Sequence, residues 1–295
     1  MSGGPFENRW VTVDGLNVRY LEAGSGPAVM LLHGASLGSS AEVWEGVMTT
    51  LAGGGHRVLA YDQPGYGLSD NPEDYSLAYR TAFITKLMDG LGVERATLVG
   101  HSQAGGMVVR VAMEQAHRVT GVAVVCTGTL LPPPPGSASA PRPGAGEAAR
   151  SDPTADDVRK LLEADVHHQE LVTPDAVERR LRLSVGKNVS AAAGRAMARE
   201  PQQDAVPLWQ RVRELPVPLL MFYGDRDRAS AGQRASLLKE QRPELDIEVV
   251  KDAAHLLMWD APGVFTSRLL PFLADAEHKA ASESHATRAG SDSRV

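Results

Sequence analysis

Short apolar runs alternate with longer segments of helical pattern along most of this chain. The runs are rich in β-branched residues and are short enough to be strands. They lie at residues 11–15, 17–24, 28–34, 56–62, 96–100, 121–128, 218–224 and 246–252. Because strands that alternate with helices form β-α-β units, the pattern predicts an α/β fold with an eight-stranded, mostly parallel sheet. Asp14-Gly15 separates the first two runs and is a turn signal, so we expect the sheet to begin with an antiparallel hairpin.

The alternation breaks between residues 131 and 207. Residues 132–153 are too rich in proline and glycine for a regular strand or helix. Three polar, helix-like segments follow, with candidate caps at Thr154, Thr173 and Ser190 and no strand after any of them. We therefore expect residues 1–130 and 208–277 to form the core domain and residues 131–207 to form an inserted helical lid. The small, polar and charged residues 278–295 are predicted to be a disordered tail.

Composition and charge exclude several classes of function. Thirty basic and thirty-six acidic residues give a net charge of −6, which offers no basic footprint for nucleic acid. The first ten residues lack the apolar core of a signal peptide, and no run of about 18 apolar residues could span a bilayer. The single cysteine, Cys126, lies in an apolar run and is interpreted as strand packing. A cytoplasmic protein with no membrane partner is expected.

No cofactor or metal site is predicted either. The glycine-rich stretch 61–70 lacks the lysine of a phosphate-binding loop, and dinucleotide-binding spacing is absent. His167 and His168 are adjacent, so on a helix they would face different directions, and no carboxylate cluster accompanies them.

Ser102 follows the predicted strand at 96–100 directly and precedes a predicted helix from Gln103. This is the context of a nucleophile elbow, in which a tight turn presents the serine hydroxyl above the sheet edge. Gly100 and Gly105 supply the small residues that such a turn requires, although Ala104 stands where a glycine is usual. The plainer alternative is a serine that caps an ordinary helix.

A serine nucleophile needs a base and an acid that orients the base. Of the nine histidines, His255 is the one in a short loop after a late strand, and Pro262 then opens the last helix. Asp225 and Asp227 both follow the strand at 218–224, and their positions do not separate them. A second oxyanion donor is expected from the loop after the third strand, so we predict an oxyanion hole made by the N–H groups of Ala35 and Gln103. His33 is interpreted as a brace for that loop.

Residues 8–275 resemble the α/β-hydrolase family through HGAS at 33–36, DQPGYGLSD at 62–70, GHSQAG at 100–105 and GDRD followed by DAAHLLMWDAP. The resemblance implies an acid three residues after Gly224, which selects Asp227. The chain is most similar to the carbon-carbon bond hydrolases that cleave meta-cleavage products, the 2-hydroxy-6-oxo-hexa-2,4-dienoates. It shares with them the run before Ser102, the lid run 167–184 and the histidine loop.

The resemblance implies that Arg180 contacts the substrate carboxylate and that Trp259 lines the pocket. Ser36, which follows Ala35, and His101, which precedes Ser102, are expected to bind substrate as well. The implied partner is a small molecule, without a cofactor, and self-association into a homo-oligomer is implied too. Two alternatives stay open: an esterase or lactonase with the same triad, and a small-molecule receptor with this fold. An epoxide hydrolase or haloalkane dehalogenase is disfavoured because those enzymes carry aspartate where Ser102 stands.

Overall fold

The computed structural model of the protein describes residues 6–134, 152–198 and 206–292. An eight-stranded sheet in the order β1-β2-β4-β3-β5-β6-β7-β8 runs through its centre. β2 is antiparallel to both β1 and β4, and all other neighbouring strands are parallel. The predicted α/β fold with a mostly parallel sheet is thus confirmed. The strands are β1 (Glu7–Val13), β2 (Leu16–Ala23), β3 (Ala28–Leu32), β4 (Arg57–Tyr61), β5 (Ala96–His101), β6 (Val119–Val125), β7 (Leu219–Gly224) and β8 (Asp246–Val250).

The predicted hairpin at the start of the sheet is also present. Asp14 and Gly15 join β1 to β2 with φ angles of 55° and 78°. Two consecutive positive φ values are the geometry of a type I′ turn, whose twist matches that of the two strands.

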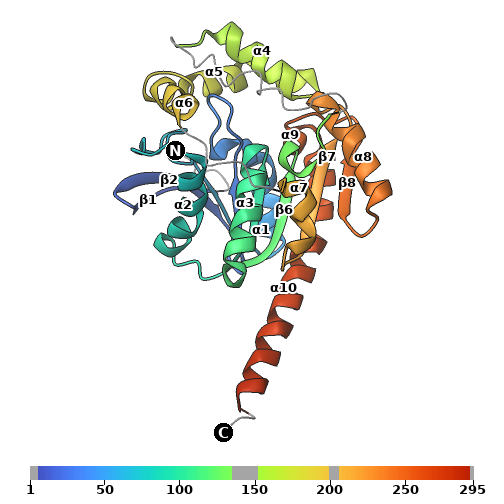
Figure 1. Cartoon of the computed structure of the whole chain (residues 1–295). Coiled ribbons are helices and arrows are strands. Elements are labelled where there is room, and N and C mark those ends of the chain that lie inside the picture. The colour runs from blue at the N-terminus through green and yellow to red at the C-terminus, as the bar shows by residue number, and fades with distance from the viewer. Residues whose placement is uncertain (1–5, 135–151, 199–205, 293–295) are drawn as a thin grey trace.

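Helices cover both faces of the sheet (Figure 1). Along β3, Met30 and Leu32 pack into the apolar cluster under α2 and α3, whereas Val29 and Leu31 pack into the cluster under α1 and α10. This alternation follows from the two-residue period of a strand buried on both faces. The helices are α1 (Glu45–Gly53), α2 (Leu77–Gly90), α3 (Gln103–Glu114), α4 (Ala155–Asp165), α5 (Pro174–Arg182), α6 (Lys187–Met197), α7 (Leu208–Arg211), α8 (Ala231–Gln241), α9 (Leu257–Asp260) and α10 (Pro262–Asp292).

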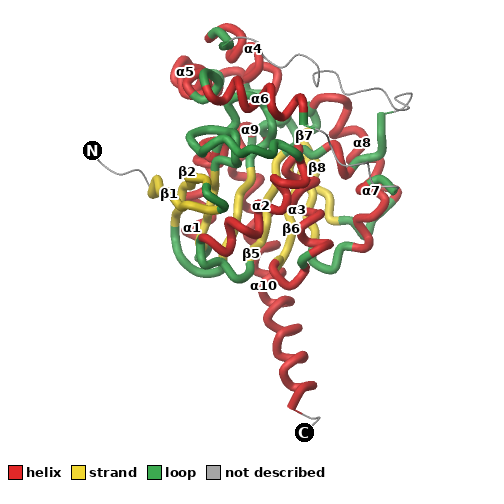
Figure 2. The backbone as a smooth tube through the Cα atoms, turned by 60° about the vertical axis from the view of Figure 1, so that its left-hand side comes forward, coloured by secondary structure: helices red, strands yellow, loops and turns green. Residues whose placement is uncertain are grey.

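Three helices, α4 to α6, lie beyond one end of the sheet, with loops gathered between them and the strands (Figure 2). Thr154 and Thr173 cap α4 and α5 as predicted, each accepting a hydrogen bond from a backbone N–H in the first turn. The third predicted cap, Ser190, is wrong: α6 begins after Gly186, whose φ of 62° sets the direction of the helix, so Ser190 lies inside it. Most of the proline-rich run at 132–153 lies outside the described residues.

Residues 278–292, for which the sequence predicted disorder, are helical in the structure. Helix α10 continues to Asp292 and projects away from the body of the protein (Figure 1). Alanine, glutamate and lysine in this stretch favour helix, and extending a helix that is already docked avoids the cost of a new nucleus. Although α10 is 31 residues long, neither it nor any other described helix has the apolar character needed to cross a bilayer.

Candidate active site

Ser102 occupies the sharp turn between β5 and α3. Its backbone has φ 55° and ψ −121°, a conformation that costs energy in a residue with a side chain. The turn is held by a 2.8 Å hydrogen bond from the Ser102 N–H to the carbonyl oxygen of Val125. A β-carbon at Gly100 would lie 2.5 Å from the carbonyl oxygen of Ala104, so only glycine fits there. Ala104 itself is fully buried in the core, where its methyl group is accommodated.

Ser102, His255 and Asp227 form one chain of hydrogen bonds. His255 Nε2 lies 3.1 Å from Ser102 Oγ, and His255 Nδ1 lies 2.9 Å from Asp227 Oδ1. A carboxylate only accepts, so Nδ1 carries the proton and Nε2 is left to accept the hydrogen of the serine hydroxyl. His255 and Asp227 are buried, whereas Ser102 is partly open to solvent. The arrangement can therefore remove a proton from the hydroxyl at a site that a substrate can reach.

The structure separates the two candidate acids. Asp227 Oδ1 also accepts the N–H of Arg228 at 2.8 Å, which fixes the carboxylate beside the imidazole. Asp225 instead turns to the loop after β8 and accepts the N–H of Ala253 at 3.3 Å. Asp225 thus supports the histidine loop through its backbone, while Asp227 contacts the ring.

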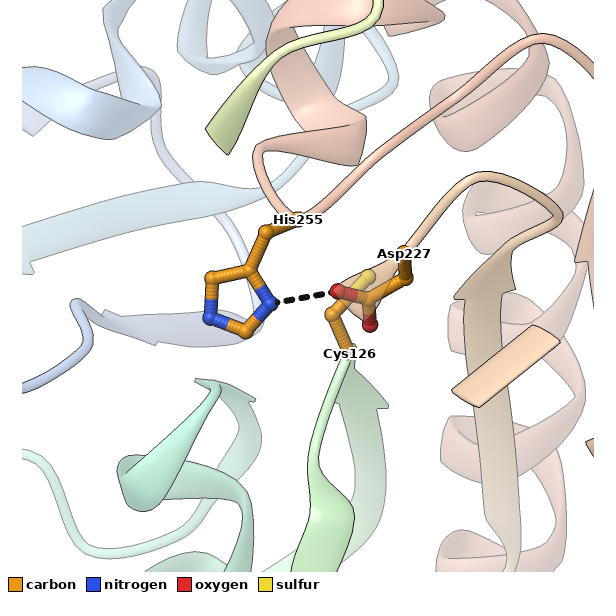
Figure 3. Close-up of side chains that lie close together, drawn as sticks. All are labelled: Cys126, Asp227 and His255. Carbon is orange, nitrogen blue, oxygen red and sulfur yellow. Dashed lines mark hydrogen bonds and ion pairs between the residues drawn. The ribbon is translucent and has the colours of Figure 1, made fainter. Parts of the chain in front are cut away.

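Cys126 lies beside Asp227 and His255 at the end of β6 (Figure 3). Ligand atoms of these three residues lie within 4.8 Å of one another, which makes them a candidate group for holding a metal ion. Burial, followed by the charge of Asp227, raises the pKa of the Cys126 thiol well above its ordinary value. A protonated thiol is a poor metal ligand and a poor nucleophile. These contacts therefore suit a packed thiol, and we assign no metal to the group.

The loop after β3 passes directly beside the elbow. A β-carbon at Gly34 would lie 3.1 Å from the β-carbon of Ser102, so the loop approaches the serine as closely as backbone can. Ala35 and Ser36 follow and are partly exposed. Gln103 is the first residue of α3, so the geometry of the helix provides no partner for its N–H. These N–H groups are the ones that sequence motifs predict for an oxyanion hole.

A buried polar network supports both donor segments, and the sequence predicted the part of it made by His33. Arg80 on α2 donates from Nη1 to Gln103 Oε1 at 2.9 Å and from Nη2 to Gln63 Oε1 at 3.1 Å. Gln63 in turn donates through its side chain to the carbonyl oxygen of His33 at 2.6 Å and through its N–H to His33 Nε2 at 3.0 Å. His33 then donates from Nδ1 to the carbonyl oxygen of Gly34 at 2.7 Å. Burial lowers the pKa of His33 to about 3, so this brace stays neutral.

His101 is buried between the elbow and the histidine loop. It is 4% exposed, and its Nε2 donates to the carbonyl oxygen of His255 at 2.9 Å. Its ring also packs against those of His255 and Trp44. These contacts are those of a support for the histidine loop, and binding of substrate by His101 stays a prediction.

Arg180 and Trp259, for which the resemblance implies contact with substrate, line one pocket. Arg180 donates from Nε to the carbonyl oxygen of Leu37 at 3.1 Å, and its buried Nη2 has no hydrogen-bond partner among the described residues. Burial lowers the pKa of Arg180 to about 10. Trp259 donates from Nε1 to the carbonyl oxygen of Val43 at 2.9 Å. Both line a small pocket with Gly38, Ser40, Glu42, Val43, Ala176, Arg179 and Leu183; Ser102 and His255 are not part of its lining.

Asp260 is another residue that sequence reasoning missed. Its carboxylate accepts the N–H of Ala254 at 2.8 Å and the N–H groups of His167 and His168 at 3.0 Å. Asp260 therefore ties the residue before His255 to the segment that follows α4. Its place five residues after the histidine was the available signal, although nothing in the sequence identified the distant partners.

Comparison with known proteins shows the family to which the chain belongs. A family model described as alpha/beta hydrolase fold matches residues 27–262. The chain is 28% identical over 269 residues to the 2-hydroxy-6-oxononadienedioate/2-hydroxy-6-oxononatrienedioate hydrolase of Burkholderia vietnamiensis, across 88% of this chain and 91% of that protein. It is 26% identical over 287 residues to the 2-hydroxymuconate semialdehyde hydrolase of a Pseudomonas strain, across 94% and 98% of the two chains.

Solved structures give the same picture of the fold. The meta-cleavage product hydrolase from Pseudomonas fluorescens superposes with a TM-score of 0.74 over 91% of this chain and 98% of its own. Sequence identity in that comparison is 22%, so the likeness concerns the fold.

Proposed function

Because the chain belongs to the α/β hydrolase fold family, we propose that it is a serine hydrolase that cleaves a carbon-carbon bond of a 2-hydroxy-6-oxo-hexa-2,4-dienoate. Ser102 is the nucleophile, His255 the general base and Asp227 the acid that orients the base. The hydrogen-bonded chain of these three side chains is the observation that carries the proposal. The preference for a meta-cleavage product is supported by the names of the relatives and by the pocket at Arg180 and Trp259.

The reaction begins with substrate binding under the α4–α6 segment, which acts as the lid. The dienol carboxylate lies near Arg180, whose buried Nη2 has a donor to offer. His255 transfers the proton that converts the dienol to its keto form, because only the keto form can stabilise the carbon leaving group as a dienolate.

Bond cleavage then follows the ordinary route of acyl transfer. Ser102 Oγ attacks the C6 carbonyl carbon while its proton passes to His255 Nε2. The carbonyl electrons move to oxygen, and the N–H groups of Ala35 and Gln103 stabilise the oxyanion. Collapse of this intermediate breaks the C5–C6 bond, and the electron pair leaves as the dienolate. The proton held on His255 Nε2 passes to this leaving group, which restores the neutral imidazole. Water activated by His255 then hydrolyses the acyl group from Ser102 and releases a carboxylic acid.

A turnover assay on two substrates tests this proposal. The loss of visible absorbance of a 6-phenyl dienoate is followed beside the release of p-nitrophenol from a short ester. Sustained turnover of the dienoate, faster than that of the ester and abolished in Ser102→Ala, is the expected result. An untouched dienoate with active ester cleavage would instead make the protein an esterase or lactonase. A single turnover of either substrate would favour a receptor.

Arg180→Met tests whether the substrate carboxylate binds at Arg180. We expect KM for the dienoate to rise at least tenfold, because a charged hydrogen bond is lost, while KM for the neutral ester stays within about twofold. Arg182→Met is the control, since Arg182 is exposed on the same helix and pairs with Glu178. Equal changes in KM for both substrates would reject the role of Arg180.

A further inference from the structure

We propose that Tyr66 is a positioning residue that makes the oxyanion hole depend on the seating of helix α6. This inference rests on the proposed function, because it concerns the loop that carries the Ala35 N–H. We call residues 33–35 the oxyanion loop. Tyr66 belongs to the loop that follows β4 and does not itself contact the reacting atoms.

Tyr66 touches both ends of the oxyanion loop. Its hydroxyl donates to the carbonyl oxygen of Ala35 at 3.2 Å, and its ring meets that of His33 edge to face with 4.9 Å between centroids. The side chain is 1% exposed, so water does not compete for these contacts. The carbonyl and N–H of Ala35 are separated by one α-carbon, so fixing the carbonyl restricts the direction of the N–H.

The ring of Tyr66 also contacts the segment proposed as the lid. Arg195 on α6 places its guanidinium carbon 3.7 Å from the ring centroid and donates from Nη1 to the carbonyl oxygen of Gly65 at 2.6 Å. Arg80 on α2 lies 5.3 Å from the same centroid. Among the described residues, Arg80 donates to the side-chain amides of Gln63 and Gln103, and Arg195 donates to a backbone carbonyl. These acceptors are neutral, so the charge of each arginine is available to the aromatic ring.

Other side chains of α6 bind the same loop without touching this ring. Lys187 Nζ donates to the carbonyl oxygens of Leu68 at 2.9 Å and Ser69 at 2.6 Å. Asn188 donates from Nδ2 to the carbonyl oxygen of Gly67 at 3.0 Å. α6 is thus seated on consecutive backbone carbonyls, and the contact through Arg195 is the one that leads to the oxyanion loop.

These contacts imply an order of events when α6 opens and closes over a substrate. When α6 lifts to admit substrate, Tyr66 loses Arg195, and its hydroxyl holds Ala35 less firmly. When α6 is seated again over bound substrate, the ring is clamped and the Ala35 N–H points to the oxyanion. Stabilisation of the transition state is therefore complete only in the closed protein.

A double-mutant cycle on the full chain tests this route, with p-nitrophenyl acetate as substrate. Tyr66→Phe keeps the ring and removes the hydroxyl, so we expect kcat to fall about tenfold with KM within about twofold. Arg195→Met should lower kcat by a few-fold. The double variant should lie within about twofold of Tyr66→Phe alone, because Arg195 acts through the missing hydroxyl.

Two matched variants serve as controls. Lys187→Met removes a contact of α6 that bypasses the ring, so its effect should multiply with that of Tyr66→Phe. Tyr79→Phe removes another tyrosine hydroxyl, one bonded to Asp14 on the surface, and should leave kcat unchanged. Thermal unfolding of each variant establishes that it is folded at the assay temperature.

Unchanged kcat in Tyr66→Phe, or multiplying effects of Tyr66→Phe and Arg195→Met, would overturn the inference. Failure of the proposed function is recognised separately, by a dienoate left untouched or turned over only once in the two-substrate assay, or by turnover that persists in Ser102→Ala. If Ser102→Ala is inactive and Tyr66→Phe matches the unaltered protein, only the role of Tyr66 is rejected.

Discussion

His101 Nε2 donates a hydrogen bond to the backbone carbonyl oxygen of His255, two residues that are 154 positions apart in the chain. The residue before the nucleophile thus supports the backbone of the base. Burial, together with the neighbouring His255, lowers the pKa of His101 well below its usual value, so the ring stays neutral. The elbow and the histidine loop are held as one unit by a contact that carries no charge.

His101→Leu should misplace the base. The variant leaves the His255 carbonyl buried without a donor, which costs about 1–3 kcal/mol of stability. We expect kcat to fall at least tenfold, with the loss of stability visible in urea unfolding. His117→Leu, at an exposed position in the short turn that follows α3, is the control. Unaltered kcat in His101→Leu would show that the loop holds His255 without this bond.

Asp227→Asn and Asp225→Asn should differ sharply. An amide at 227 no longer stabilises the protonated imidazole or its tautomer, so kcat should fall by about 10³- to 10⁴-fold. An amide at 225 can still accept the N–H of Ala253, so kcat should stay within about threefold. Steady-state kinetics on one ester decide between them. Similar losses of kcat in the two variants would show that Asp227 is not the only aspartate that supports His255.

The stability of the protein should fall on mild acidification, in part through His33. Burial lowers its folded pKa from 6.5 to about 3, so between these values the unfolded chain binds a proton that the folded protein does not. Stability is therefore fully present well above pH 6.5 and decreases below it, by about 1 kcal/mol at pH 5.5 for one such histidine. Urea unfolding at pH 7.5 and 5.5 should show a smaller loss in His33→Gln. An equal loss in both proteins would contradict the assignment.

Gly100→Ala, with Gly46→Ala in α1 as its control, tests whether the elbow needs glycine. The methyl group at 100 would meet the backbone of Ala104, so we expect a loss of at least about 2 kcal/mol and lower activity. Nothing lies within 4 Å of the corresponding position at Gly46 in α1, where alanine should be neutral or stabilise by up to about 1 kcal/mol. Urea unfolding of both variants measures the difference. Equal stabilities would show that the turn at Ser102 can relax.

Local pattern was enough to predict much of the fold. Strands buried on both faces stand out as apolar runs, and Ser102 lies where a strand is followed at once by a helix. The hairpin at Asp14-Gly15 is equally local. The start of α6 differs from the prediction because Gly186, with its positive φ, takes the place of a side-chain cap.

Contacts between distant segments were beyond such reasoning. Asp225 and Asp227 are alike in sequence, and only the fold turns one towards His255 and the other towards the backbone. Tyr66 reads as part of a glycine-rich turn until its hydroxyl is seen to reach Ala35. The same holds for α10, whose polar stretch after residue 277 shows no apolar stripe and is helical because it extends a docked helix.

The direction of α10 has a practical consequence. The end of this helix lies on the opposite side of the molecule from the α4–α6 segment (Figure 1). A carrier protein or a solid support joined through the C-terminus would therefore leave the path to Ser102 open, with α10 as a built-in spacer. Immobilised protein attached in this way should keep its access to dissolved reactants.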